Sequence, residues 1–161
     1  MNNYVCKSKN EIIYEYSVEH VAALRSTAIV RRLSAPVGFW MSSPRTLQVC
    51  YNGIGPDSWA PCLRSAVTFC LDVFESDALI HDYEFEHAPR TYRAFTKANL
   101  RFAYNTIMNA FYCANLIAGL QHTVLGIFLA LLCQLFGWRG FKCTNIKNII
   151  NKIETKELDK I

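Results

Sequence analysis

The chain has 161 residues, which is enough for one compact domain with a single core and a short appended segment. Hydrophobic residues make up 52% of the sequence and charged residues 19%, so either the core is unusually rich or part of the chain meets lipid. The formal net charge is +4, and the lysines and arginines do not cluster as binding to a phosphate backbone requires. We therefore expect no nucleic-acid partner.

The seven cysteines are odd in number, form no Cys-x-x-Cys pair and follow no secretory signal peptide. This pattern predicts reduced thiols in a protein that is cytoplasmic or membrane-associated and is not secreted through a signal peptide. It gives no support to a zinc site, because no two cysteines have the spacing of zinc ligands.

Two short stretches of the N-terminal half alternate between apolar and polar residues, as half-buried strands do. They are residues 13–18 and residues 46–51. Residues 21–33 mix side chains that favour helix with side chains that favour strand, and they leave the type of element open. The sequence therefore predicts a mainly helical α+β fold with a small strand-containing N-terminal part.

The middle of the chain has helical periodicity. Residues 62–88 contain no glycine or proline, and their apolar positions recur at helical intervals, which predicts one or two helices with a start near Ser76. Residues 91–110 predict another helix, in which Asn99 is the polar exception on a largely apolar face. The two central helices would then cross at His81 and Asn99.

The C-terminal region is strongly apolar. Residues 102–138 contain no charged side chain, and residues 116–138 are long enough to cross a bilayer, which takes about 20 apolar residues. Gln121 and Gln134 would be costly against hydrocarbon, so we favour a buried helix hairpin as the core and keep a membrane span as the alternative. His122 lies amid apolar neighbours, and we expect a core histidine with a satisfied hydrogen bond.

The domain organisation follows from these segments. Residues 1–144 are predicted to form a single domain whose C-terminal part is an apolar helical region. Residues 145–161 place isoleucines at helical spacing among lysines and acidic residues. That pattern predicts a short amphipathic tail, packed on the body of the protein or on a partner.

One dipeptide has the side chains for chemistry, since His81 is followed directly by Asp82. Neighbouring side chains of a helix project about 100° apart, so a base and a metal ligand can face one cavity without competing for the same point. A neutral imidazole takes a proton from water, and a carboxylate with backbone carbonyls suits a hard cation such as calcium. The glycine turn at residues 51–55 would supply the carbonyls, and Asn99 would orient the imidazole by a hydrogen bond.

These residues resemble the phospholipase A2 superfamily, most closely its short viral and bacterial members. The shared order is a Tyr-x-Gly-x-Gly turn, here Tyr51-Asn52-Gly53-Ile54-Gly55, and then a helix with His-Asp and an aromatic residue, here His81-Asp82-Tyr83. The same stretch is similar to uncharacterised phage-encoded proteins in which Ala-Asp-x-x-Phe follows, matched here by Ala98-Asn99-Leu100-Arg101-Phe102. The resemblance covers residues 51–105, about a third of the chain.

The phospholipase A2 resemblance implies that His81 is the general base that activates water and that Asn99 supports it. Calcium would be bound by Asp82 and by the backbone carbonyls of Tyr51, Gly53 and Gly55. The implied function is that of a phage- or prophage-type protein that hydrolyses lipid esters in a calcium-dependent way, with phospholipid or a membrane as its partner.

The alternative is a non-catalytic phage accessory or virion-associated protein. Such a protein would bind a phage protein, a host protein or a membrane through its apolar C-terminal half. Asn99 favours this alternative, because an amide orients an imidazole but stabilises an imidazolium less well than a carboxylate does.

Overall fold

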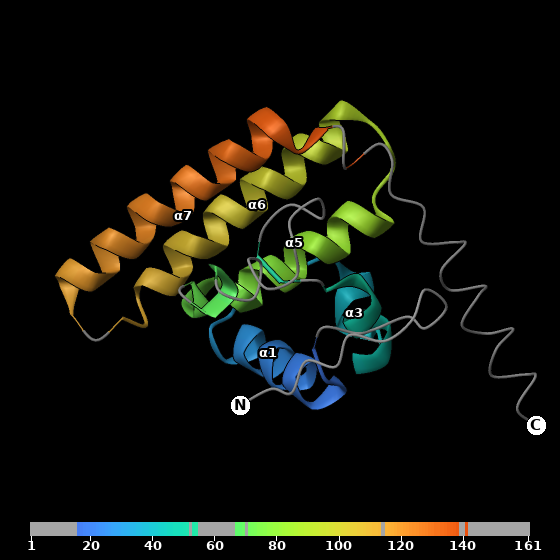
Figure 1. Cartoon of the computed structure of the whole chain (residues 1–161), viewed down its shortest axis with the longest axis horizontal. Coiled ribbons are helices and arrows are strands. Elements are labelled where there is room, and N and C mark those ends of the chain that lie inside the picture. The colour runs from blue at the N-terminus through green and yellow to red at the C-terminus, as the bar shows by residue number, and fades with distance from the viewer. Residues whose placement is uncertain are drawn as a thin grey trace, which may run out of the picture.

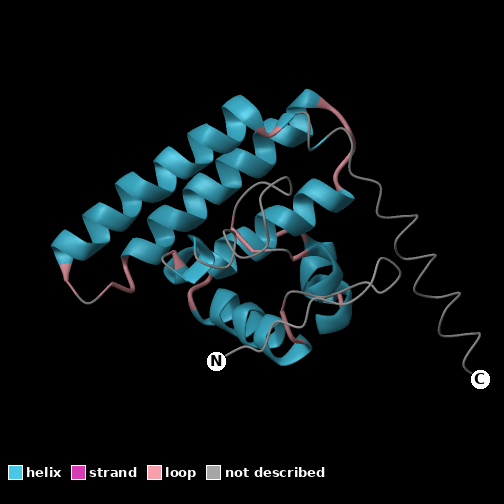
Figure 2. Cartoon of the chain, in the orientation of Figure 1, coloured by secondary structure: helices cyan, strands magenta, loops and turns pink. Residues whose placement is uncertain are grey.

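The computed structural model describes residues 16–51, 53–54, 67–69, 71–113, 115–138 and 141 of the chain. These residues are mainly helical, and none of them lies in a strand (Figure 2). The predicted strand-containing N-terminal part, and with it the α+β fold class, is therefore wrong for the part of the chain that the structure describes.

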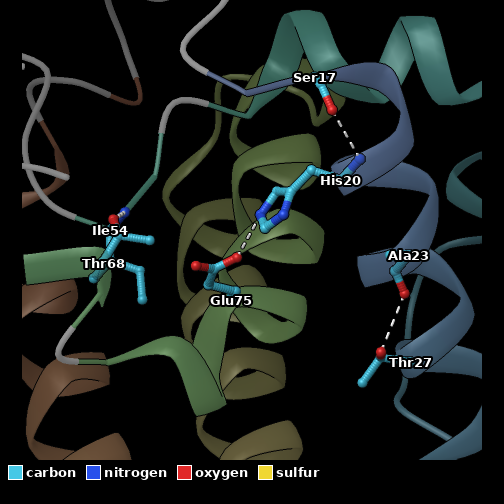
Figure 3. Close-up of polar contacts among 7 residues, drawn as sticks. All are labelled: Ser17, His20, Ala23, Thr27, Ile54, Thr68 and Glu75. Atoms are coloured by element: carbon cyan, nitrogen blue, oxygen red, sulfur yellow. Dashed lines mark hydrogen bonds and ion pairs between the residues drawn. The ribbon is translucent and has the colours of Figure 1, made fainter. Parts of the chain in front are cut away.

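Helix-starting residues explain this correction. Ser17 lies in the first alternating stretch, and its hydroxyl caps α1 (Val18–Val30) by accepting a hydrogen bond from the backbone N–H of His20 at 3.1 Å (Figure 3). Ser43 caps α3 (Pro44–Cys50) in the same way, with a proline at the first helical turn, where a missing N–H costs nothing. Alternation over six residues is a weaker signal than these caps. Residues 13–15 lie outside the described residues.

The N-terminal helices α1, α2 (Val37–Met41) and α3 form one layer of the molecule. Helix α5 (Glu75–His87) lies against this layer, after the short 3-10 helix η1 (Asp72–Phe74) (Figure 1). The shared core consists of buried apolar side chains from α1, α2, α3 and α5: Val21, Ala28, Phe39, Leu47, Leu79 and Ile80. One face of α5 thus closes the N-terminal core.

The opposite face of α5 is polar and is also buried. It carries Asp77, His81 and Glu84, which are spaced as i, i+4 and i+7 and therefore lie along one side of the helix. This side meets α6 (Tyr92–Ala110), so that α5 lies between the N-terminal layer and α6 (Figure 1). A helix covered on both sides has little exposed surface, which explains why polar residues are so often buried in it.

Helices α6 and α7 (Leu116–Phe136) form an antiparallel hairpin along the outer side of α5 (Figure 1). Thr91 and Asn115 cap them, each accepting a hydrogen bond from the backbone N–H three residues later. The helix predicted over residues 91–110 is confirmed, with Thr91 as its cap.

Two glycines allow the hairpin to pack closely. A Cβ atom on Gly126 would collide with the side chain of Thr106, and one on Gly119 would lie 2.9 Å from the carbonyl oxygen of Ala110. A glycine inside a helix costs about 1 kcal/mol relative to alanine, but α7 continues through both positions because close contact with α6 offsets that cost.

The outer side of α7 is not part of a core. Among its residues only Gly119, Gly126 and Ala130 are buried, so the prediction of a buried hairpin is wrong for α7. Its large apolar side chains are exposed: Leu116, Ile117, Leu120, Val124, Leu125, Ile127, Phe128, Leu131, Leu135 and Phe136. Within the described ranges, α7 is the one helix that is long and apolar enough to cross a membrane, as judged by length and composition alone.

Candidate functional site

His81 and Asn99 lie where α5 crosses α6, and the structure brings them together. The imidazole Nε2 is 2.8 Å from Asn99 Oδ1, and both side chains are buried. The ring of His81 packs between Phe85 and Phe102, at centroid distances of 4.1 and 5.2 Å. An amide oxygen accepts a hydrogen bond, so this contact favours the tautomer with its proton on Nε2. Asn99 thus orients the imidazole, while a catalytic role of either residue stays a prediction.

The hydrogen bonds continue from Asn99 into α7. Its amide donates to Gln134 Oε1 at 2.7 Å, and the amide of Gln134 donates to Tyr92 Oη at 3.1 Å and to Thr96 Oγ1 at 3.3 Å. The chain of contacts therefore runs across three helices, from α5 through α6 to α7. Gln134, which sequence alone marked only as costly in lipid, holds α7 to the same network.

Asp82 lies beside His81, with its Oδ1 atom 3.8 Å from His81 Nδ1 and 22% of its side chain exposed. Its charge also acts on Cys50 of α3. The pKa of this thiol is raised first by burial, then by the negative charge of Glu86 and then by that of Asp82. A thiol next to two carboxylates is held in its protonated form. The site is thus acidic on the side where Tyr51 follows Cys50.

The predicted calcium turn packs on the N-terminal part of the molecule. The ring of Tyr51 is buried against Tyr16, with centroids 4.7 Å apart. Gly53 has a φ of 89°, a conformation that favours glycine, and a Cβ atom there would lie 2.6 Å from Tyr16 Oη and 2.8 Å from Thr68 Oγ1. The turn is held by a hydrogen bond from the Ile54 N–H to Thr68 Oγ1 at 2.7 Å (Figure 3).

Calcium binding by this turn stays a prediction. Gly55, one of the residues expected to contribute a carbonyl, lies outside the described residues. The described part of the chain contains no group of three or more His, Cys, Asp or Glu side chains that could hold a metal ion. Asp82 is therefore the one carboxylate of the predicted site, and backbone carbonyls of the turn would have to supply the other ligands.

Two further polar pairs line the same α5–α6 contact, and sequence analysis missed both. Arg101 Nη1 donates to Glu84 Oε1 at 2.6 Å, and the amide of Asn109 donates to Asp77 Oδ2 at 2.5 Å. The buried contacts Asp77–Asn109, His81–Asn99 and Glu84–Arg101 are called the polar seam below. The spacing of Asp77, His81 and Glu84 on one face of a helix was visible in the sequence and could have predicted it.

The polar seam holds a carboxyl group that burial makes unusually basic. Asp77 has no exposed surface, and burial raises its pKa to about 8, although the hydrogen bond from Asn109 and the charge of Arg31 act in the opposite direction. Burial also raises the pKa of Glu84, against the charges of Arg101 and His81. Perturbed carboxyl groups occur at functional sites, but structural networks produce them too.

The second unusual feature is the exposed apolar surface of the α6–α7 hairpin. On α6 and at its C-cap residue, Leu100, Tyr104, Ile107 and Phe111 are exposed and follow one another at intervals of three and four residues. They form a straight stripe on one face of the helix. Together with the exposed apolar side chains of α7 given above, this stripe is called the hairpin surface below.

Comparisons with protein-family models, with curated proteins and with solved structures found no match for this chain.

Proposed function

We propose that this protein is membrane-associated and that the hairpin surface binds the lipid bilayer. The observation that carries the proposal is α7, whose apolar side chains face outward along its full length. Moving one large apolar side chain out of water stabilises by about 1.5–3 kcal/mol, so several of them provide ample free energy for binding lipid. Exposed apolar surface of this extent is typical of interaction sites.

The packing of α6 favours binding along the bilayer surface over a membrane span. Helix α6 runs beside α7 and carries Lys97 on its exposed side and Arg101 in an ion pair with Glu84. If α7 crossed the bilayer, these charged groups would come within the hydrocarbon region, where ionised side chains are costly. With α7 lying in the interface, the N-terminal layer and the ion pair of Arg101 with Glu84 remain on the aqueous side, while Lys97, which lies at the edge of the apolar stripe of α6, would extend its ammonium group towards water.

Vesicle binding tests this proposal. The double variant Val124→Glu/Phe128→Glu places two charges on exposed positions of α7, which are 62% and 54% exposed. We expect its partition coefficient onto phosphatidylcholine–phosphatidylglycerol vesicles to fall at least about tenfold, because a loss of about 1.4 kcal/mol is sufficient for that change.

A matched control lies on the opposite side of the molecule. Met41→Glu introduces a charge at an apolar residue of α2 that is 81% exposed, and it should leave vesicle binding unchanged. Equal binding by the wild type and the α7 double variant would contradict the proposal. Release of bound wild-type protein by alkaline wash distinguishes interfacial binding from a membrane span, which resists it.

A second candidate function is calcium-dependent hydrolysis of lipid esters, as the phospholipase A2 resemblance implies. The observation that favours it is the oriented imidazole of His81, with the Asp82 carboxylate 3.8 Å away. In this phage- or prophage-type hydrolase, His81 would activate water, Asn99 would hold the ring, and Asp82 would bind calcium. The non-catalytic accessory protein is the alternative, and it needs only the hairpin surface.

Thermal melting with calcium and with a chelator separates these two functions. A calcium site in the folded protein raises the melting temperature once calcium exceeds its dissociation constant. The hydrolase predicts such a rise for the wild type and none for Asp82→Asn, followed by release of fatty acid from phospholipid vesicles. No calcium response in either protein would remove the calcium mechanism and leave the accessory function.

A further inference from the structure

Cys113 and His122 form a close pair at the turn of the α6–α7 hairpin. Cys113 lies just beyond the end of α6, where its backbone N–H donates to the carbonyl of Ala110 at 3.2 Å. Its Sγ atom is 2.9 Å from Nδ1 of His122, which lies on α7. A thiol within hydrogen-bond distance of an imidazole is the arrangement in which a base takes the thiol proton and a nucleophilic thiolate forms.

The imidazole of His122 is held in place from the other side. Its ring lies edge-to-face against Phe74 of η1, with centroids 5.8 Å apart. Cys113 and His122 are both partly exposed, so the pair lies at the surface of the molecule. The sequence predicted a satisfied core histidine, and the structure instead places His122 at a partly exposed hydrogen bond with a thiol.

The two other cysteines in the described part of the chain lie in different surroundings. Cys50 is buried and its thiol donates to the carbonyl of Thr46, while burial raises the pKa of Cys133 to about 11. Neither thiol is hydrogen-bonded to a histidine among the described residues. These two thiols are held protonated, which makes them internal controls for any reaction at Cys113.

The surroundings of Cys113 select the class of reagent. Large apolar side chains flank Cys113 along the chain: Phe111, Leu116 and Ile117 are 77%, 88% and 72% exposed, and Tyr112 directly before Cys113 is 47% exposed. They provide a surface on which a long hydrocarbon chain would lie while its reactive end reaches Cys113. A polar reagent would gain no binding free energy from burial against this surface.

We propose that Cys113 and His122 form a nucleophilic pair that accepts a long-chain acyl group from an acyl-coenzyme A thioester. His122 Nδ1 takes the proton from the Cys113 thiol, and the sulfur attacks the thioester carbonyl. The bond from the carbonyl carbon to the coenzyme A sulfur breaks, and that sulfur takes the proton from His122. The products are S-acylated Cys113 and free coenzyme A, so one thioester replaces another with no oxidant or reductant.

The acyl chain would add a second lipid contact to the hairpin surface. One acyl chain gives only marginal membrane binding by itself, and stable anchoring takes two signals. The hairpin surface would be the other signal. The acyl-transfer reaction itself takes place without a membrane, so its test does not depend on whether the unmodified protein binds lipid.

The test incubates the full chain with palmitoyl-coenzyme A, without vesicles, and follows the mass of the intact protein. We expect a gain of one palmitoyl group that hydroxylamine removes, located on Cys113 and on neither Cys50 nor Cys133. Cys113→Ser should abolish the gain. His122→Gln should slow it by roughly 100-fold, in the range that loss of a general base produces, with melting curves confirming that the variant is folded.

Two further measurements test whether the apolar side chains select a long acyl chain and whether His122 activates Cys113. Leu116→Glu should slow transfer from palmitoyl-coenzyme A but leave transfer from acetyl-coenzyme A unchanged. Alkylation by iodoacetamide should be faster at Cys113 than at Cys133, and this preference should be lost in His122→Gln. Acylation at equal rates in the wild type and His122→Gln, or equal rates with the two thioesters, would overturn the proposal.

Discussion

Polar residues are usually exposed and apolar residues buried, and helices α5 and α7 show the opposite relation. Helix α5 carries acidic groups and a histidine, yet all of its first seven residues are buried between two layers of helices. Helix α7 has no charged residue, yet only three of its 21 residues are buried. Burial here therefore follows from position in the layer order, and the exposed apolar helix offers a surface that a partner or a bilayer would cover.

The buried polar helix is stabilised by partners on α6, although Asp77 Oδ1 and Glu84 Oε2 have no hydrogen bond within the described part of the chain. Each of Asp77, His81 and Glu84 contacts a side chain of α6. A buried polar group without a hydrogen bond costs about 1–3 kcal/mol, so the polar seam stabilises the contact only while its pairs remain complete. Helix α7 is joined to this network through one residue, Gln134, which contacts Asn99, Tyr92 and Thr96 of α6.

The largest expected effect comes from the carboxyl group of Asp77. Its pKa is raised from 3.8 to about 8 in the folded protein, so between these values the folded state binds a proton that the unfolded state has lost. Its contribution to stability is fully present below about pH 4 and is lost as the pH rises towards 8, at about 1.4 kcal/mol per pH unit.

Asp77→Asn removes this titration while keeping an amide of similar shape. We expect urea unfolding of the variant to show a flatter dependence on pH, and the variant to be the more stable protein above pH 8. An identical pH dependence in Asp77→Asn and the wild type would show that Asp77 is ionised in the folded protein.

A smaller effect is expected when the ion pair of the polar seam is broken. Arg101→Met keeps the aliphatic length of the side chain but leaves Glu84, whose side chain is 8% exposed, without its cation. We expect a loss of about 3 kcal/mol, measured by urea unfolding at pH 7. Lys97→Met removes an exposed cation from the same helix and should change the stability by less than about 0.5 kcal/mol. Equal losses in the two variants would contradict the role of the seam.

The smallest effect on stability is expected on α7. Val124→Glu/Phe128→Glu changes two exposed side chains, so the free energy of unfolding should change by less than about 0.5 kcal/mol per residue, while vesicle binding is lost. Urea unfolding of the double variant and of the wild type measures this change. A large loss of stability would mean that these side chains pack against the protein, and it would remove the contrast between α5 and α7.

Part of the candidate site was predictable from helical spacing. The helix over residues 91–110 and the crossing of His81 with Asn99 follow from periodicity, and both are present. The polar partners were not predictable in the same way, because Asn109 and Arg101 are identified as partners of Asp77 and Glu84 only when α6 has a known direction and register against α5. The described residues 16–18 and 46–51 are not strands, because helix capping by Ser17 and Ser43 outweighed short alternation.

The sequence by itself determined where most helices begin, through caps such as Thr91 and Asn115, and that one of them is apolar enough for a membrane. These are local properties, set by hydrogen bonds within one turn and by composition. Only the tertiary structure decided that α5 lies inside and α7 outside, and that Cys113 meets His122. Burial and side-chain pairing depend on the order in which helices stack, and no local pattern of residues encodes that order.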